Sequence, residues 1–231
     1  METSKNFLTP YYRRHNQRRQ EHLASLNLPI AGKTVLEVGA GVGDHTSFFI
    51  DRQCSVTSTD GRQESLDILQ QRFPQITTFS WDIEFPPPKG IKKSQIVYAY
   101  GILYHTRNPR TVLENLASLC TEILLLETCV SFGDEELIHL TAEAINDPTQ
   151  ALGGTGCRPT RPWIFKTLKW FFPFVYVTKT QPRHEEFPID WNKSTEENNE
   201  NKLNRSVFVA SKIPLCNENL SSDLIDKQEY R

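Results

Sequence analysis

The feature that most constrains the fold of this chain is an apolar segment that runs directly into a turn with glycine at every second position. Residues 34–38 are apolar and partly β-branched, which predicts a buried strand. Gly39, Gly41 and Gly43 then let the backbone turn tightly and approach a ligand where any Cβ would intrude. Residues 44–49 predict the first turn of a helix. A strand, a glycine turn and a helix in this order are typical of a nucleotide-type pocket at the carboxyl edge of a parallel sheet.

Two acids flank this turn and bear on which ligand it binds. A dinucleotide-binding loop has the spacing G-x-G-x-x-G, with a pyrophosphate at the helix N-terminus. Here the spacing is G-x-G-x-G, Asp44 stands where the third glycine would be, and Glu37 lies two residues before the turn. These acids would repel a pyrophosphate, but they suit a ligand with a cationic sulfonium and an ammonium group. That description fits S-adenosylmethionine (SAM), and the segment resembles motif I of class I SAM-dependent methyltransferases. A tight turn that binds nothing is the alternative.

The second predicted strand also ends in an acid. Residues 54–60 predict a strand that ends at Asp60, which follows Glu37 by 60 − 37 = 23 residues. An acid about 20 residues beyond the first strand meets the ribose hydroxyls in folds of this kind. Asp60 also suits a cap for the helix expected from residue 64, and we favour the ribose role because a strand precedes it.

The third predicted strand, residues 76–82, ends at Asp82 and is followed by Ile83. In the methyltransferases that this chain resembles, an acid at this place accepts from the adenine amino group and its apolar neighbour flanks the ring. The resemblance therefore implies adenine contacts for Asp82 and Ile83. Acids at three successive strand ends favour a SAM site more strongly than any one of them alone.

The fourth predicted strand, residues 94–100, leads into a segment rich in reactive side chains. Gly101 follows the strand directly, and we expect it to contact the cofactor. Residues 103–109 have the pattern Leu-Tyr-His-x-x-x-Pro, and a fifth strand, 122–128, ends in Leu-Leu-Leu-Glu-Thr. Both patterns resemble a methyltransferase branch that includes the tRNA wobble-uridine carboxymethyltransferases.

Tyr104 and His105 are the catalytic candidates of this segment. His105 lies where the sheet meets its ligand, and an imidazole with a pKa near neutrality suits a general base. Two roles stay open for His105: a base, or a group that hydrogen-bonds a backbone carbonyl and shapes the loop. Tyr104 is equally open between lining the methyl-transfer cavity and plain packing.

The last third of the chain predicts two more strands, 174–179 and 206–211, that form a closing hairpin. The resemblance implies that only the last of about seven strands is antiparallel, so the connections 129–173 and 180–205 both open onto the ligand edge. Connections beyond about 12–15 residues are usually functional or disordered. We interpret these two as a substrate lid, the alternative being that their arginines pair with nearby acids. The expected substrate contacts are Arg158, Arg161, Arg183 and Trp191, with His184 as a second base candidate.

Residues 10–26 predict a helix with several basic and aromatic side chains. Arg14 and Arg18 share one face of it. Such a face suits RNA or a phosphorylated substrate, although a solvated face with snorkelling side chains is the commoner case. In the family that the chain resembles, prefixes of this kind cover the SAM pocket and a tyrosine can reach the methionine carboxylate. The resemblance therefore implies that role for Tyr11 or Tyr12.

Length, net charge and cysteine content limit the classes of protein to which this chain can belong. With 231 residues, a net charge of −2 and a pI near 6.3, the chain suits one domain with extensions and disfavours broad nucleic-acid binding. No apolar run approaches the ~18 residues of a membrane span, and five scattered cysteines favour reduced thiols in the cytosol. No C-x-x-C or H-E-x-x-H motif points to a metal. His139 and Glu143 have helical spacing, which we interpret as a helix face rather than a metal pair.

Together these patterns predict an α/β, doubly wound, mostly parallel, seven-stranded Rossmann-like methyltransferase sheet with an antiparallel last strand and a lid insertion. The expected parts are a helical prefix (1–29), a methyltransferase domain (30–212) with its lid (129–173) and loop (180–205), and a polar tail (213–231). The resemblance implies a cytoplasmic SAM-dependent methyltransferase that acts on an oxygen or nitrogen of a small polar metabolite or sugar-like acceptor. RNA modification and a non-catalytic SAM-binding regulatory protein are the alternatives. The acceptor and the oligomeric state stay open.

Overall fold

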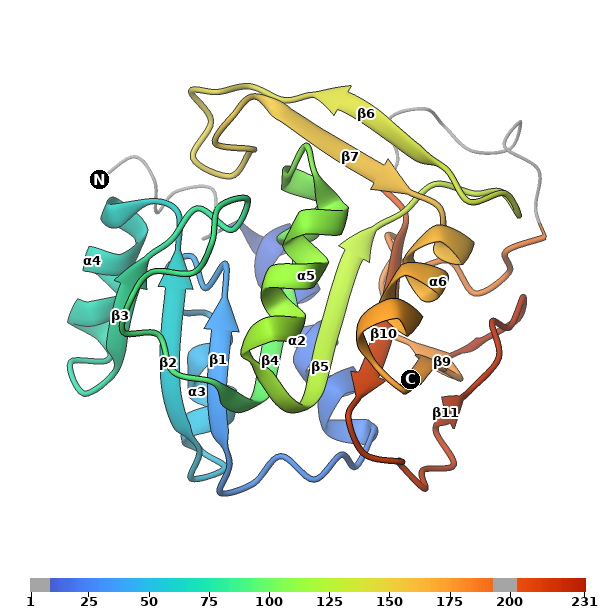
Figure 1. Cartoon of the computed structure of the whole chain (residues 1–231), viewed down its shortest axis with the longest axis horizontal. Coiled ribbons are helices and arrows are strands. Elements are labelled where there is room, and N and C mark those ends of the chain that lie inside the picture. Colours follow the sequence, from blue (N-terminus) through green and yellow to red (C-terminus); the bar gives the residue numbers. More distant parts are fainter. Residues whose placement is uncertain (1–8, 193–202) are drawn as a thin grey trace.

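A sheet of eight strands forms the centre of the structure, a computed structural model that describes residues 9–192 and 203–231 (Figure 1). The strand order is β11-β8-β10-β5-β4-β1-β2-β3, and the strands from β5 to β3 are parallel. β10 is antiparallel to both of its neighbours, and β11 is antiparallel to β8. The strands are β1 (Thr34–Val38), β2 (Ser55–Asp60), β3 (Thr77–Ser80), β4 (Ser94–Tyr100), β5 (Cys120–Cys129), β8 (Phe174–Thr178), β10 (Arg205–Ser211) and β11 (Leu220–Ser221). The predicted prefix 1–29 and loop 180–205 each lie partly outside the described residues.

Helices cover both faces of the sheet, as the doubly wound prediction requires (Figure 1). One face carries α2 (Pro10–Ser25), α3 (Thr46–Ile50) and α4 (Gln63–Arg72), and the other carries α5 (Pro109–Leu119) and α6 (Arg161–Phe171).

The sequence of β5 explains why both of its faces are covered. Leu124 and Leu126 belong to the core beneath α5, whereas Ile123 and Leu125 belong to the core on the α2 side. Successive side chains of a strand point to opposite faces, and all four are fully buried. An unbroken apolar run is therefore what a strand needs when helices pack on both sides of the sheet.

The seven predicted strands are confirmed, and the eighth comes from the polar tail. β11 pairs with the edge of β8 and adds Leu220 to the core. A strand of two residues leaves no period in a sequence, which is why seven strands were expected rather than eight. The tail also reaches α2, because the side-chain amide of Asn217 donates to the carbonyl of Leu26 at 2.7 Å. A separate parallel pair joins β9 (Thr180–Gln181) to β12 (Glu229–Tyr230).

The predicted lid of residues 129–173 has two different parts. The first is an antiparallel hairpin of β6 (Ile138–Ala142) and β7 (Thr155–Pro159), which crosses above the carboxyl edge of the sheet (Figure 1). The second is α6, whose apolar face is buried in the core, so this helix belongs to the sheet and not to the lid. The helix face predicted for His139 and Glu143 is wrong, because His139 lies in β6 opposite Arg158 and no local period reveals that pairing.

Candidate active site

A cavity of about 800 Å³ lies at the carboxyl edge of the sheet. The glycine turn, the strand ends, α2 and the β6–β7 hairpin all contribute to its walls. The predicted cofactor residues that line it are Tyr11, Glu37, Gly39, Gly41, Asp60, Asp82, Ile83 and Gly101. Tyr104, His105 and Arg158 from the predicted catalytic and substrate sets line it as well. Most of the expected site residues, from distant parts of the sequence, thus meet around one space.

The three glycines of the first turn have different surroundings: Gly39 and Gly41 line the cavity, whereas Gly43 packs against α4. All three have a positive φ, at 69° for Gly39, 54° for Gly41 and 82° for Gly43. A Cβ on Gly39 would lie 2.9 Å from the Cβ of Ile102, so this position has no room for a larger residue. A Cβ on Gly43 would lie 2.9 Å from Leu69 of α4, and Gly43 does not line the cavity. Gly43 therefore serves the close approach of loop and helix rather than direct contact with a ligand.

Asp60 holds the glycine turn and the segment that leads into α4. Its Oδ2 accepts a hydrogen bond from the backbone N–H of Gly41 at 2.9 Å, and its Oδ1 accepts one from the backbone N–H of Arg62, also at 2.9 Å. The second bond forms an Asx turn that leads into α4, whose N-cap residue is Arg62 and which has no side-chain cap, and the first fixes the glycine turn. Burial raises the pKa of the Asp60 carboxyl, although these backbone bonds favour its ionised form. Asp60 also lines the cavity, and the alternative role as a helix cap does not agree with the structure.

Glu37 is the most deeply buried of the three strand-end acids. Its Oε2 accepts from the hydroxyls of Thr46 at 2.7 Å and Ser58 at 2.8 Å. Burial nevertheless dominates and raises the pKa of Glu37 to about 7. Asp82 uses Oδ1 to accept from the backbone N–H of Glu84 at 3.1 Å, and Ile83 is buried beside it. The three acids therefore face the cavity from the ends of three neighbouring strands.

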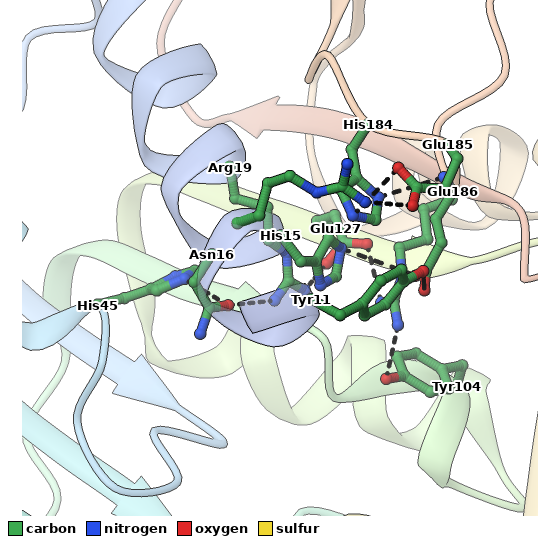
Figure 2. A network of polar contacts seen from close by, with 12 residues as sticks. Tyr11, His15, Asn16, Arg19, His45, Tyr104, Glu127, His184, Glu185 and Glu186 are labelled. Carbon is green, nitrogen blue, oxygen red and sulfur yellow. Dashed lines mark hydrogen bonds and ion pairs between the residues drawn. The ribbon is translucent and has the colours of Figure 1, made fainter. Parts of the chain in front are cut away.

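A buried network of charges lies where α2 meets the ends of β5 and β10 (Figure 2). Arg19 and Arg205 both pair with Glu127, the latter at 3.1 Å, and Arg205 also pairs with Glu186 at 2.5 Å. Two cations and two anions balance, as buried charges must. Arg205 further donates to the hydroxyl of Tyr104 at 3.0 Å.

Sequence reasoning missed the roles of Arg19, Glu186 and Arg205 in this network. Glu127 belongs to the Leu-Leu-Leu-Glu-Thr pattern, but the pattern predicts no partner for its carboxylate. An acid at the end of an apolar strand does indicate a buried charge that needs a partner. Its partners lie 108 and 78 residues away, so the sequence does not identify them.

Tyr11 and His184 meet at the edge of this network (Figure 2). The Tyr11 hydroxyl donates to Glu186 Oε1 at 2.6 Å, and the rings of Tyr11 and His184 are in contact, with centroids 5.1 Å apart. His184 is buried behind Tyr11 and does not line the cavity, so the prediction of a second base at this position does not agree with the structure.

Tyr104 and His105 lie in the 3-10 turn η1 (Leu103–His105) that follows β4. Tyr104 is buried and its hydroxyl is held by Arg205, so it both packs and lines the cavity. His105 Nδ1 lies 2.5 Å from Glu143 Oε2, which comes from the hairpin. Burial lowers the pKa of His105 although Glu143 opposes the shift, so the imidazole is neutral near pH 7.

Only one of the four predicted substrate residues lines the cavity. Arg158 of β7 does so, with Nη1 donating to the carbonyl oxygens of Tyr104 at 3.2 Å and Cys157 at 2.8 Å. Arg161 instead begins α6, donates to the carbonyl of Ile225 at 3.0 Å and stacks on Trp191. Arg183 is exposed and also lies outside the lining. The structure therefore does not place Arg161, Arg183 or Trp191 at the cavity. Arg161 and Trp191 instead pack α6 against the tail.

Three properties of the described chain concern function more broadly. No helix in residues 9–192 and 203–231 is long and apolar enough to cross a membrane. All five cysteines are free, and burial raises the pKa of Cys129 and Cys157 to about 12, which leaves both thiols unreactive. Across the same residues, no group of three or more His, Cys, Asp or Glu side chains is arranged to hold a metal ion.

Comparison with known proteins gives one relative and many similar structures. No family model matches the chain. A tRNA U34 carboxymethyltransferase of Idiomarina loihiensis is 32% identical over 140 residues, which are 55% of this chain and 41% of that protein. The N-terminal domain of EvdMO1 with S-adenosylhomocysteine (SAH) bound has a TM-score of 0.61 at 19% identity, covering 85% of this chain and 80% of its own. A Burkholderia thailandensis 1,6-didemethyltoxoflavin-N1-methyltransferase with 1,6-didemethyltoxoflavin and SAH bound has a TM-score of 0.57 at 17% identity, covering 92% and 84%.

Proposed function

Because the chain has the fold of class I SAM-dependent methyltransferases, we propose that it transfers a methyl group from SAM to an oxygen or nitrogen of a small polar or sugar-like acceptor. The observation that carries this proposal is the meeting of Glu37, Asp60 and Asp82 with the glycine turn around one cavity. Each acid comes from a different strand end, where ligands bind in sheets of this type. A dinucleotide would place a pyrophosphate against these acids, which disfavours a dehydrogenase.

The residues of the cavity fit SAM in type and in order. We assign Glu37 and Gly39 to the methionine end, Asp60 to the ribose hydroxyls, and Asp82 with Ile83 to the adenine. Gly39 supports this assignment because a side chain there would fill the space between the turn and Ile102. When bound, SAM supplies a methyl group already activated by the sulfonium. The remaining work of the protein is to orient the acceptor, exclude water and remove a proton.

Two features support a small acceptor. The cavity volume of about 800 Å³ falls within the roughly 300–1,000 Å³ of small-molecule sites. The tip of the hairpin, including Thr149 and Gln150, lines the cavity and restricts access from that side. The toxoflavin methyltransferase that this chain resembles in fold was solved with a small heterocycle bound, which is consistent with the proposal. We assign His105 as the base that removes the proton from the acceptor.

Calorimetric titration with SAH, and with NADH in parallel, tests the cofactor. We expect binding of SAH and not of NADH. Loss of a hydrogen bond to a charged group costs about 1.5–3 kcal/mol, so Asp60→Ala should weaken SAH binding by about 10- to 100-fold. The matched control is Asp67→Ala, which removes an exposed acid of α4 that lies outside the cavity and should leave the affinity unchanged.

Other outcomes of this titration discriminate between the alternatives. Tighter binding of NADH than of SAH would contradict the assignment of the cofactor. SAH binding without transfer of a labelled methyl group to any component of a cell extract would favour a non-catalytic SAM-binding protein. The Asp60→Ala variant also loses the bond to Gly41, so its thermal stability is measured alongside its affinity.

RNA modification is the second candidate, favoured by the tRNA U34 carboxymethyltransferase that matches part of the chain. Arg14 and Arg18 lie towards solvent on α2, as RNA contact requires. Each already pairs with an acid, Glu185 and Glu21 respectively, which weakens the case. Salt-dependent binding of tRNA that Arg14→Ala or Arg18→Ala reduces would support this candidate. Absence of tRNA binding at low salt would exclude it.

A further inference from the structure

The hairpin that closes the cavity also supplies an acid to the candidate base. We propose that Glu143 is a positioning residue for His105, and that docking of the β6–β7 hairpin onto the η1 turn completes the catalytic base. This inference rests on the proposed function. Glu143 follows β6 directly, and its side chain is only 3% exposed, which is unusual for a glutamate in a surface hairpin.

Polar groups on both sides hold the Glu143 carboxylate in one orientation. Oε2 lies 2.5 Å from His105 Nδ1 and accepts from the backbone N–H of Ala151 at 2.7 Å. Oε1 lies 3.5 Å from the guanidinium of Arg158. The backbone N–H of Glu143 donates to the carbonyl of Gly154 at 2.9 Å, which fixes the residue within the hairpin. Hydrogen bonds and Arg158 lower the pKa of Glu143 despite its burial, so it is ionised at neutral pH.

Gly156 shows that the hairpin is shaped to bring this carboxylate against the turn. A Cβ at Gly156 would lie 2.3 Å from Glu143 Oε1 and 2.5 Å from the carbonyl oxygen of Tyr104. The next residue, Cys157, directs its thiol to the carbonyl of Leu103 at 3.5 Å. β7 therefore rests directly on η1, and only glycine leaves space for both the carboxylate and the backbone of the turn.

The contact with Glu143 fixes which nitrogen of His105 is available to a substrate. A carboxylate can only accept, so a neutral imidazole in this contact carries its proton on Nδ1 and its lone pair on Nε2. Nε2 makes no hydrogen bond to any of the described residues, and the His105 side chain lines the cavity. The charged groups that face His105 are Glu143, Asp147 and Arg158 from the hairpin and Arg205 from β10.

The proton balance follows from this arrangement. The acceptor atom gains the methyl group and loses its proton to His105 Nε2, while the electron pair of the broken S–C bond stays on sulfur. The imidazolium that forms is stabilised by the Glu143 carboxylate at Nδ1 and later releases its proton to solvent. Glu143 itself keeps its charge throughout.

Nitrogen-15 NMR of the histidine side chains, with SAH bound, tests the tautomer without an acceptor. The chain has six histidines, and His105→Ala identifies the resonance of interest. We expect wild-type His105 to be neutral at pH 7 with the proton on Nδ1. Glu143→Gln should reduce that preference, because an amide can also donate to Nδ1. The matched control Glu135→Gln, at an exposed acid three residues before the hairpin, should leave the tautomer unchanged. A wild-type protein with the proton on Nε2 would refute the proposal even if the Glu143 variant does not fold.

Transfer of labelled methyl from SAM to the small-molecule fraction of a cell extract gives the second readout. General bases contribute about 10²–10⁴-fold, so His105→Ala should lower kcat by at least about 10²-fold and Glu143→Gln by about 10²-fold, with SAH affinity retained. The acid limb of the pH profile should move to lower pH in Glu143→Gln, because the carboxylate raises the pKa of His105. In the His105→Ala background the Glu143 change should have no further effect.

These readouts separate the inference from the proposed function. If Glu143→Gln lowers kcat by the same factor with and without His105, Glu143 does not act through His105 and the inference fails while methyl transfer stands. If the wild-type protein binds SAH but labels nothing, the proposed function fails, whereas the NMR measurement still decides whether Glu143 orients His105.

Discussion

Replacing Glu37 with glutamine should remove a pH dependence from the stability of this protein. The Glu37 carboxyl is buried, and its pKa rises from an ordinary 4.5 to about 7 in the fold. In the unfolded chain the group loses its proton near pH 4.5, whereas the folded protein retains it until about pH 7. Folding therefore opposes ionisation, and the free energy of unfolding falls as pH rises between these two values.

The pKa difference sets the size of this effect. A gap of about 2.5 units corresponds to about 3 kcal/mol, most of which is lost between pH 5 and pH 7. Glutamine has nearly the same shape and does not ionise. Its amide oxygen can accept from the hydroxyl of Thr46 or Ser58, and the other hydroxyl can rotate to accept from its amide N–H. The variant should therefore gain about 2–3 kcal/mol relative to wild type between pH 5 and pH 8.

Urea unfolding of both proteins at pH 5, 6, 7 and 8 measures this difference directly. Asp60 also has a raised pKa, but it is present in both proteins and cancels in the comparison. Parallel stability curves for wild type and Glu37→Gln would refute the reasoning, because they would mean that Glu37 ionises normally in the fold. Binding gives a second readout: a ligand ammonium against Glu37 favours the ionised carboxylate. SAH binding near pH 6.5 should therefore release a proton from wild type and none from the variant.

Two further predictions concern the buried charges and the glycine turn. Arg205→Met leaves Glu186 without its arginine and should lower the free energy of unfolding by about 3–5 kcal/mol, measured by urea unfolding; a loss below about 1 kcal/mol would mean that the network is solvated. Gly39→Ala, with a φ of 69° and a clash with Ile102, should weaken SAH binding at least about tenfold. Gly32→Ala has a φ of 74° and open space around it, so it should lose stability but keep its SAH affinity.

The fold could be predicted from the sequence because its evidence is local. Each parallel strand is a short run of apolar or β-branched residues, and Gly39, Asp60 and Asp82 each follow or end a strand at the same edge of the sheet. Strand direction alone then brings them together. The seven large strands and the doubly wound arrangement are therefore confirmed by the structure.

The rest of the site depends on contacts between distant segments, which no local pattern contains. Glu143 was expected on a helix face, yet hairpin pairing turns it towards His105, 38 residues earlier. Arg161 has the chemistry of an anion-binding residue, but burial against Trp191 and the carbonyl of Ile225 occupies its guanidinium. Residue type therefore indicated the possible chemistry, while tertiary packing decided which side chains are available for it.

The polar inner face of α2 has a consequence for how the cavity opens. The buried residues of this helix are His15, Asn16, Arg19, His22 and Leu23, of which only the last is apolar. Detaching the first part of the helix, which carries His15, Asn16 and Arg19, would thus expose mainly groups that water solvates well, and little of the apolar surface that denaturants act upon. Amide hydrogens protected by α2 should exchange through an opening whose free energy changes little with urea and markedly with ionic strength. Salt, rather than denaturant, would then govern how often the cavity is uncovered.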